Sequence, residues 1–250
     1  LLLAARSFSI LCSWLTLVLI FAAALMWLRP LPAWWRVGIG AATAVLLMTT
    51  PSFLHASGRA WNHDFPILLT LVAAVGQVGW LKRAHGPRGL LWRLHWWPLV
   101  AGVLLGLAAS ARLTFAVAGA AFVLSVFFVL PWRTRQAWFA VGLFCAGGLL
   151  GALPALYMLG VAPAQFIFGN LGYAQLNTAY YQQAAGGDPG AAMTLGGKLG
   201  STVEYIVTQP GNLLLVLLAG YGLWRAHRQL RHAAELHFLL LLVPCFLVGA

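Results

Sequence analysis

The chain alternates long apolar runs with short polar breaks. A membrane-spanning helix needs roughly 20 apolar residues, somewhat fewer when it is buried among other helices. Eight runs meet this pattern: 8–28, 37–54, 65–81, 97–111, 113–130, 137–159, 203–224 and from 236 onward. The fourth and fifth runs are separated only by Ser110-Ala111-Arg112. The pattern predicts an all-α bundle of about eight spans, with residues 1–250 as one transmembrane domain and residues 161–202 as a long external loop.

Composition supports a membrane protein. The chain is 62% hydrophobic and 8% charged, with a mean hydropathy of +0.86, whereas soluble domains are near one quarter charged. A soluble enzyme, a secreted disulfide scaffold and a disordered segment are therefore excluded. Cys12, Cys145 and Cys245 lie in apolar runs and are expected to be buried thiols. Because the chain starts at Leu1 inside apolar sequence, we expect it to be a fragment of a longer membrane protein.

The basic residues sort by side when the polar breaks are assigned alternately to the two faces of the membrane. Eleven of the fifteen Lys and Arg residues fall on one side, which the preference for basic cytoplasmic loops makes the inner side. The net charge of +11 is then a signature of topology rather than of nucleic-acid binding. Asp64, Asp188 and Glu204 fall on the external side, and only Glu235 falls inside. Chemistry is therefore expected on the external side.

The external segment 55–64 carries the strongest candidates. Asp64 stands at the start of a span, where a carboxylate acts as general base, cation binder or metal ligand, or else caps the helix. Arg59 either pairs with Asp64, faces a phosphate or is merely interfacial. His63 is a weak metal-ligand candidate beside the alternative of a solvated loop histidine. No cofactor is identified, and a divalent metal at Asp64 is left open.

Two further regions carry polar candidates. Arg112, between two apolar spans, either binds an anion such as a lipid phosphate or extends to the external interface. In the 161–202 loop, Tyr173 and Tyr180 stand among amide side chains, which suits sugar binding or an interfacial amphipathic segment equally. Glycines at 102 and 106, and at 147, 148 and 151, predict close helix packing.

The order of these motifs resembles GT-C glycosyltransferases, in particular the protein-mannosyltransferase-like and aminoarabinose-transferase-like group. The motifs are Pro51-Ser-Phe-Leu-His55-Ala-Ser-Gly-Arg59-Ala60 ending in Asp64, then Gly102-x-x-x-Gly106-Leu-Ala-Ala-Ser-Ala-Arg112. The resemblance covers most of residues 1–160. Asp64 matches the second of two acidic positions in the family, and Arg112 matches a basic position where relatives often have lysine. The first acid has no counterpart here, so this fragment alone is expected to be inactive.

The resemblance implies an inverting glycosyltransferase of the bacterial inner (plasma) membrane, part of the cell-envelope machinery, with an outward-facing active site. It implies transfer of a sugar from a polyprenyl-phosphate carrier to a lipid, glycan or protein acceptor. Asp64 is then the catalytic residue, and the substrate-binding candidates are Arg59, His63, Arg112, Tyr173 and Tyr180. The alternatives are a transporter or lipid flippase and a non-catalytic membrane scaffold. Asp64 and Arg112 facing one external cavity would favour the transferase, and a cavity open to both sides would favour transport.

Overall fold

The computed structural model describes residues 2–29, 31–50, 53, 63–84, 96–173, 175–176, 195–230 and 234–249. These residues are almost entirely helical and contain no strand, which confirms the all-α class. The first half contains α1 (Leu2–Trp27), α2 (Ala33–Thr49), α4 (Asp64–Ala84), α6 (Trp96–Ala111), the 3-10 helix η2 (Leu113–Val117) and α7 (Ala118–Val126). The second half contains α8 (Arg135–Gly151), α9 (Leu153–Val161), α10 (Pro163–Ile167), the π-helix η3 (Phe168–Gly172), α12 (Leu195–Thr208), α13 (Pro210–Leu230) and α14 (Ala234–Gly249).

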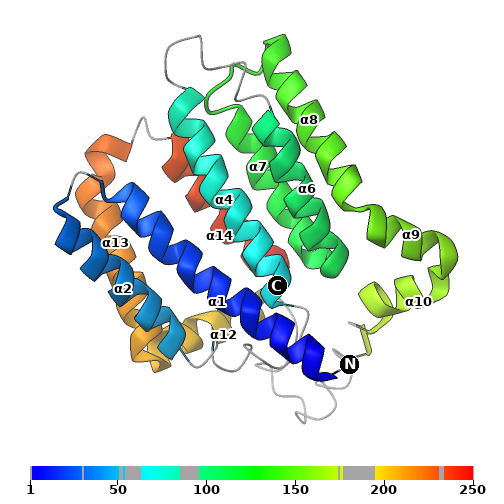
Figure 1. Ribbon diagram of the computed structural model, residues 1–250, viewed down its shortest axis with the longest axis horizontal. Helices are drawn as coiled ribbons and strands as arrows, with labels where there is room; N and C mark the ends of the chain where they lie inside the picture. Colours follow the sequence, from blue (N-terminus) through cyan, green and yellow to red (C-terminus); the bar gives the residue numbers. More distant parts are fainter. Residues whose placement is uncertain are drawn as a thin grey trace.

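The helices form a bundle in which α4 is central (Figure 1). Helix α4 packs against α1 on one side and α6 on the other, with α14 behind it, and α2 and α13 continue the bundle beyond α1. The core lies where α4, α6, α7 and α14 meet, and Phe122 and Phe238 pack edge to face there with ring centroids 4.9 Å apart. Beside this core, Gln77 of α4 donates to Ser125 Oγ of α7 at 2.9 Å and accepts from Trp97 Nε1 of α6 at 3.0 Å. This buried polar network joins three helices with its hydrogen bonds satisfied.

Glycines allow α6 and α8 to approach until their backbones touch. A Cβ on Gly102 would overlap the carbonyl oxygen of Phe144, and one on Gly147 would overlap the carbonyl oxygen of Leu99. The same holds for Gly106 and Gly151 one turn farther along. The close packing predicted from the glycine spacing is confirmed at these four glycines, in the manner of small-residue contacts between membrane helices, whereas a Cβ on Gly148 would meet nothing within 4 Å.

The expected number of eight spans is larger than the number of helices that are long enough. Within the described ranges, only α1 and residues 64–83 of α4 are long and apolar enough to cross a membrane as single helices. The pairs α8–α9 and α12–α13 raise the number to four if each is one bent span, with bends of 50° and 100°. The remaining apolar runs form helices of 10–17 residues. A helix of 16 residues such as α6 is about 24 Å long, against a hydrocarbon core of about 30 Å.

The segment 161–202, expected as a long external loop, contains helices. Its described residues are largely helical: α10 and η3 follow α9 directly, and α12 begins at Leu195. Pro163 starts α10 in the position where a proline is favoured, because its missing N–H would have no helical partner there. Helix α12 ends at Thr208, before Pro210, where the chain bends sharply into α13. Of the amide side chains in this segment, Gln165 lies on α10 and Asn170 on η3, whereas residues 177–194 lie outside the described residues.

The two ends of the bundle differ in their charged residues and in their tryptophans. Ser9 near the start of α1 binds Asp64 at the start of α4, and Ser110 Oγ at the end of α6 donates to the carbonyl of Gly151 at the end of α8 at 3.1 Å. We call this side of the bundle the Asp64 end. Lys82 and Arg83 of α4, and Arg133 and Arg135 beside the start of α8, lie at the opposite end, as the alternating assignment of charges requires.

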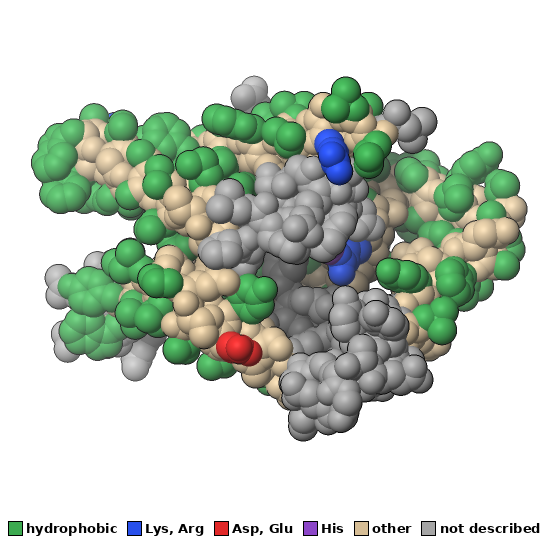
Figure 2. Space-filling view, turned by 90° about the horizontal axis from the view of Figure 1, so that it is seen from below, with side chains coloured by type: hydrophobic (Ala, Val, Ile, Leu, Met, Phe, Trp, Pro, Cys, Tyr) green, Lys and Arg blue, Asp and Glu red, His purple; other side chains and the backbone are tan. Residues whose placement is uncertain are grey.

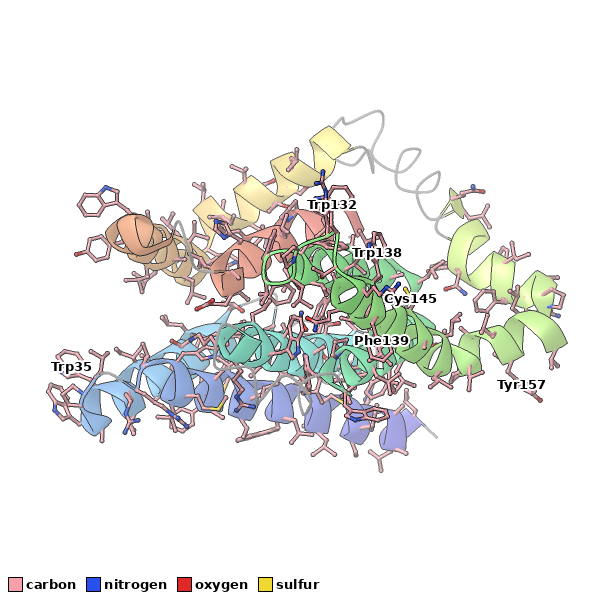
Figure 3. All side chains as sticks on the ribbon, turned by 90° about the horizontal axis from the view of Figure 1, so that it is seen from above. Trp35, Trp132, Trp138, Phe139, Cys145 and Tyr157 are labelled. Atoms are coloured by element: carbon pink, nitrogen blue, oxygen red, sulfur yellow. The ribbon has the colours of Figure 1, made fainter. Side chains whose placement is uncertain are left out.

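Exposed tryptophan side chains, apart from Trp14 within α1, collect with these basic residues. Exposed indoles stand at the end of α1 and at the starts of α2, α6 and α8: Trp27, Trp34, Trp35, Trp96, Trp132 and Trp138. Figure 3 looks from above, with Trp35 at one edge and Trp132 beside Trp138. In the view from below, hydrophobic side chains cover most of the periphery that is drawn in colour (Figure 2). An apolar circumference with a tryptophan-rich rim is typical of a protein that sits in a bilayer.

Candidate functional site

The site begins where α4 begins. The amide of Ile67 donates to the carbonyl of His63 at 3.1 Å, so His63 is the capping residue and Asp64 is the first helical residue. The helix therefore starts one residue before the expected span, and Pro66 lies in its first turn. A carboxylate in the first turn is stabilised by the positive end of the helix dipole.

Asp64 is buried, with 7% of its surface exposed. Ser9 of α1, itself buried, donates its hydroxyl hydrogen to Oδ2 of the carboxylate. Burial of a carboxylate costs free energy unless hydrogen-bond donors satisfy it. Here α1 supplies one donor, the Ser9 hydroxyl, and α4 supplies the positive end of its dipole. Asp64 is thus held in a defined orientation at the boundary of the apolar bundle.

Asp64 lines a half-open cavity of about 550 Å³ bordered by residues of α1, α2, α4, α13 and α14, a volume within the range of about 300–1,000 Å³ usual for ligand pockets. On α4 the cavity follows one face from Asp64 through Ile67, Thr70 and Leu71 to Ala74. These positions span about 15 Å along the helix axis. The other lining residues are Ser13, Thr16, Ile20, Leu47, Thr50, Phe53, Asn212, Leu239 and Leu242.

The hydroxyl groups that line the cavity differ in their hydrogen-bond partners. Three threonines donate to carbonyl oxygens of their own helices at 2.7–2.9 Å: Thr16, Thr50 and Thr70. Ser13, with 4% of its surface exposed, has no hydrogen-bond partner for Oγ. Buried polar groups are nearly always paired, so the Ser13 hydroxyl is available to a molecule in the cavity.

Arg112 lies outside the cavity, where it contacts His63, the residue before Asp64. Its backbone is extended (φ −156°, ψ 114°), which ends α6 and separates it from η2, and its guanidinium contacts the imidazole of His63. The predicted break at Arg112 is confirmed. Arg112 is not among the described residues that line the cavity, so a cavity shared by Asp64 and Arg112 is not found there; Arg112 instead contacts His63, the residue that precedes Asp64.

The electrostatics of His63 follow from this position. Burial lowers the pKa of His63 below its usual 6.5, and the positive charge of Arg112 lowers it further, while the Asp64 carboxylate opposes the shift. His63 is therefore neutral at pH 7. A neutral imidazole accepts a hydrogen bond from a guanidinium, whereas an imidazolium would repel it.

The other predicted residues are not brought to this site. Tyr173 follows η3 with 59% of its surface exposed and does not line the cavity. Arg59 and Tyr180 lie outside the described residues. In the described part of the chain no group of three or more His, Cys, Asp or Glu side chains is placed to hold a metal ion, so no metal ligand set forms around Asp64 there.

Several residues that line the cavity or contact Asp64 were missed by sequence reasoning. Ser9, Ser13 and Thr16 lie at helical spacing within the first apolar run, and all three are buried on the inward face of α1. Hydroxyls at i, i+4 and i+7 mark one face of a helix, and this signal was available in the sequence. Thr50 and Asn212 carry no such signal, because their place at the cavity depends on how α2 and α13 pack.

Comparison with protein-family models, curated proteins and solved structures finds no match for this chain.

Proposed function

We propose that this chain belongs to a membrane glycosyltransferase that moves a sugar from a polyprenyl-phosphate carrier to an acceptor on the external side. The observation that carries the proposal is the position of Asp64: a buried carboxylate at a helix start, on the wall of a largely apolar cavity inside a bundle of apolar helices. A lipid-tethered sugar presents its reacting carbon near the membrane surface, where such a carboxylate meets it.

The proposed chemistry assigns Asp64 the role of general base. The acceptor hydroxyl gives its proton to the carboxylate while its oxygen forms a bond to the anomeric carbon of the sugar. The bond from that carbon to the phosphate oxygen breaks, and the polyprenyl phosphate leaves with the electron pair. Attack opposite the leaving group inverts the anomeric centre. The Ser9 hydroxyl orients the carboxylate for this transfer.

Arg112 is proposed to bind the departing phosphate from outside the cavity, because the cavity shared with Asp64 that would have favoured the transferase is not found among the described residues. The guanidinium offers paired donors suited to phosphate oxygens, and its contact with neutral His63 keeps it beside Asp64 without neutralising its charge.

We further propose that the four shorter apolar helices also cross the membrane, which restores the eight spans of the sequence. Support comes from their packing between the longer helices.

The test is a transfer assay on the full-length protein in proteoliposomes. Labelled polyprenyl-phosphate hexoses and pentoses are supplied with a membrane lipid extract, and release of polyprenyl phosphate is measured. Wild-type protein should consume one donor, and Asp64→Asn should reduce the rate by at least about 100-fold with normal membrane insertion. Glu204→Gln, an exposed acid on α12, is the matched control and should remain active. Full activity of Asp64→Asn would remove the carboxylate from the chemistry.

A lipid flippase is the second candidate, favoured by one observation. The 100° bend between α12 and α13 is a broken span or re-entrant element, and interrupted helices line substrate paths in transporters. The same proteoliposomes distinguish the two functions. Movement of the labelled lipid between leaflets with its sugar bond intact would support the flippase, and cleavage of that bond would support the transferase.

A further inference from the structure

The cavity behind Asp64 has one polar end and one apolar end. Asp64, Thr50 and Asn212 belong to the helix ends that meet at one side of the bundle, whereas Leu71 and Ala74 lie two to three turns farther along α4. An amphiphile with one apolar chain fits this arrangement, with its head at Asp64 and its chain between α4 and α14.

The charge of the lining restricts the head. Asp64 is the only ionisable side chain among the described lining residues, and none of those residues is basic. A phosphate placed beside this carboxylate would meet like charge, and the described lining residues supply no compensating cation, which is unfavourable. A hydroxyl or amine head instead donates a hydrogen bond to the carboxylate.

Ser13 provides the second contact for such a head. Its buried Oγ has no partner and lies one turn of α1 beyond Ser9, the residue that holds Asp64. The apolar part of the cavity gives little selectivity, because lipid tails are as apolar as its leucine and isoleucine side chains. The polar pair Ser13 and Asp64 therefore determines which amphiphile binds.

We propose that this cavity binds the acceptor, as a single-chain amphiphile whose head is a non-anionic hydrogen-bond donor, a hydroxyl or an amine. This inference rests on the proposed transferase function and deepens it: the donor phosphate binds on the Arg112 side of Asp64, and the acceptor binds on the cavity side. The nucleophilic oxygen or nitrogen then lies next to the carboxylate that removes its proton.

Binding is tested separately from transfer, with full-length protein in nanodiscs of neutral phosphatidylcholine. The probe is hexadecanol with a photoactivatable diazirine on its chain, and the competitors are unlabelled hexadecanol, hexadecylamine and hexadecyl phosphate. We expect crosslinks on α1, α4 and α14. Hexadecanol and hexadecylamine should both compete, and their relative strength distinguishes an alcohol from an amine acceptor. Hexadecyl phosphate should compete at least about tenfold more weakly.

Two variants assign the selectivity to named atoms. Ser13→Ala should weaken hexadecanol binding about three- to tenfold, the effect of one lost hydrogen bond, while Ser7→Ala, exposed on the same helix, should leave it unchanged. Asp64→Asn should remove most of the discrimination against hexadecyl phosphate. Equal or stronger competition by the phosphate in the wild-type protein, or crosslinks confined to the outer surface, would overturn the inference. Selective alcohol binding without sugar transfer by the same protein would overturn the proposed function instead.

Discussion

Ser9 and Asp64, 55 positions apart in the sequence, meet at one end of the bundle, where the serine hydroxyl donates to the buried carboxylate. The contact joins the start of α1 to the start of α4. It supplies a donor to a charge that the surrounding apolar side chains cannot solvate, so the first helix contributes directly to the candidate site.

Ser9→Ala should therefore destabilise the protein. Removal of a hydrogen bond to a buried charged group costs about 1–3 kcal/mol. The measurement is the apparent Tm of the full-length protein in detergent. Ser7→Ala, exposed two positions earlier, should leave the Tm unchanged. An equal Tm for both variants would mean that the carboxylate does not depend on the Ser9 hydroxyl.

Gly147→Ala should separate α6 from α8. The new Cβ would overlap the carbonyl oxygen of Leu99, and overpacking of this kind costs about 1–3 kcal/mol. Gly142 of the same helix has nothing within 4 Å of its added Cβ, so Gly142→Ala should stabilise the helix by about 0.5–1 kcal/mol. Thermal unfolding of the two variants should give shifts of opposite sign. Similar shifts would argue against close packing of these helices.

Acid should weaken the protein through His63. Its folded-state pKa lies below the usual 6.5, so the unfolded chain binds more protons near this pH. The stability that this group contributes is present above the unfolded pKa and is lost as pH falls through the folded pKa. Between about pH 7.5 and about pH 5.5, the Tm of the wild type should fall more than that of His63→Gln. The other six histidines are common to both proteins, and an identical fall would show that His63 does not contribute.

Hydropathy predicts the helices well where each span is simple. The run at 97–111 becomes α6 with its start shifted by one residue, and the break at Arg112 follows from a charge that cannot continue an apolar helix. The bend after Gly151 was less accessible, because it lies within a continuous apolar run whose direction depends on packing. The bend at Gln209 falls where Gln209-Pro210-Gly211-Asn212 interrupts the apolar run at 203–224, so the sequence does mark it.

The candidate site was predicted only in part. Asp64 and Arg112 were found as rare charges at span ends, and the contact between Arg112 and His63 was not. The cavity depends on five helices, and the inward face of α1 is defined only once α4 lies against it. Pairing Ser9 with Asp64 needs that tertiary contact, although the spacing of Ser9, Ser13 and Thr16 already marks a polar stripe.

Arg112 provides a test of phosphate binding. In the transfer assay, Arg112→Ala should raise the apparent KM for the lipid donor by about tenfold, because the guanidinium is proposed to contact the phosphate. Arg112→Lys should retain part of the affinity, since a point charge remains without the paired donors. Arg133→Ala, exposed at the other end of the bundle, is the control. An unchanged KM for Arg112→Ala would indicate that the side chain only extends to the interface.

Cysteine labelling tests the orientation of the bundle. Arg133 lies with the basic residues and the tryptophan-rich rim, and Glu204 lies on α12; both are exposed. In a background without Cys12, Cys145 and Cys245, an impermeant thiol reagent added to intact cells should label Glu204→Cys and not Arg133→Cys, because basic segments stay in the cytoplasm. Permeabilised cells should label both. Labelling of Arg133→Cys from outside would invert the topology and, with it, place Asp64 on the side of the membrane opposite to a donor on the external face.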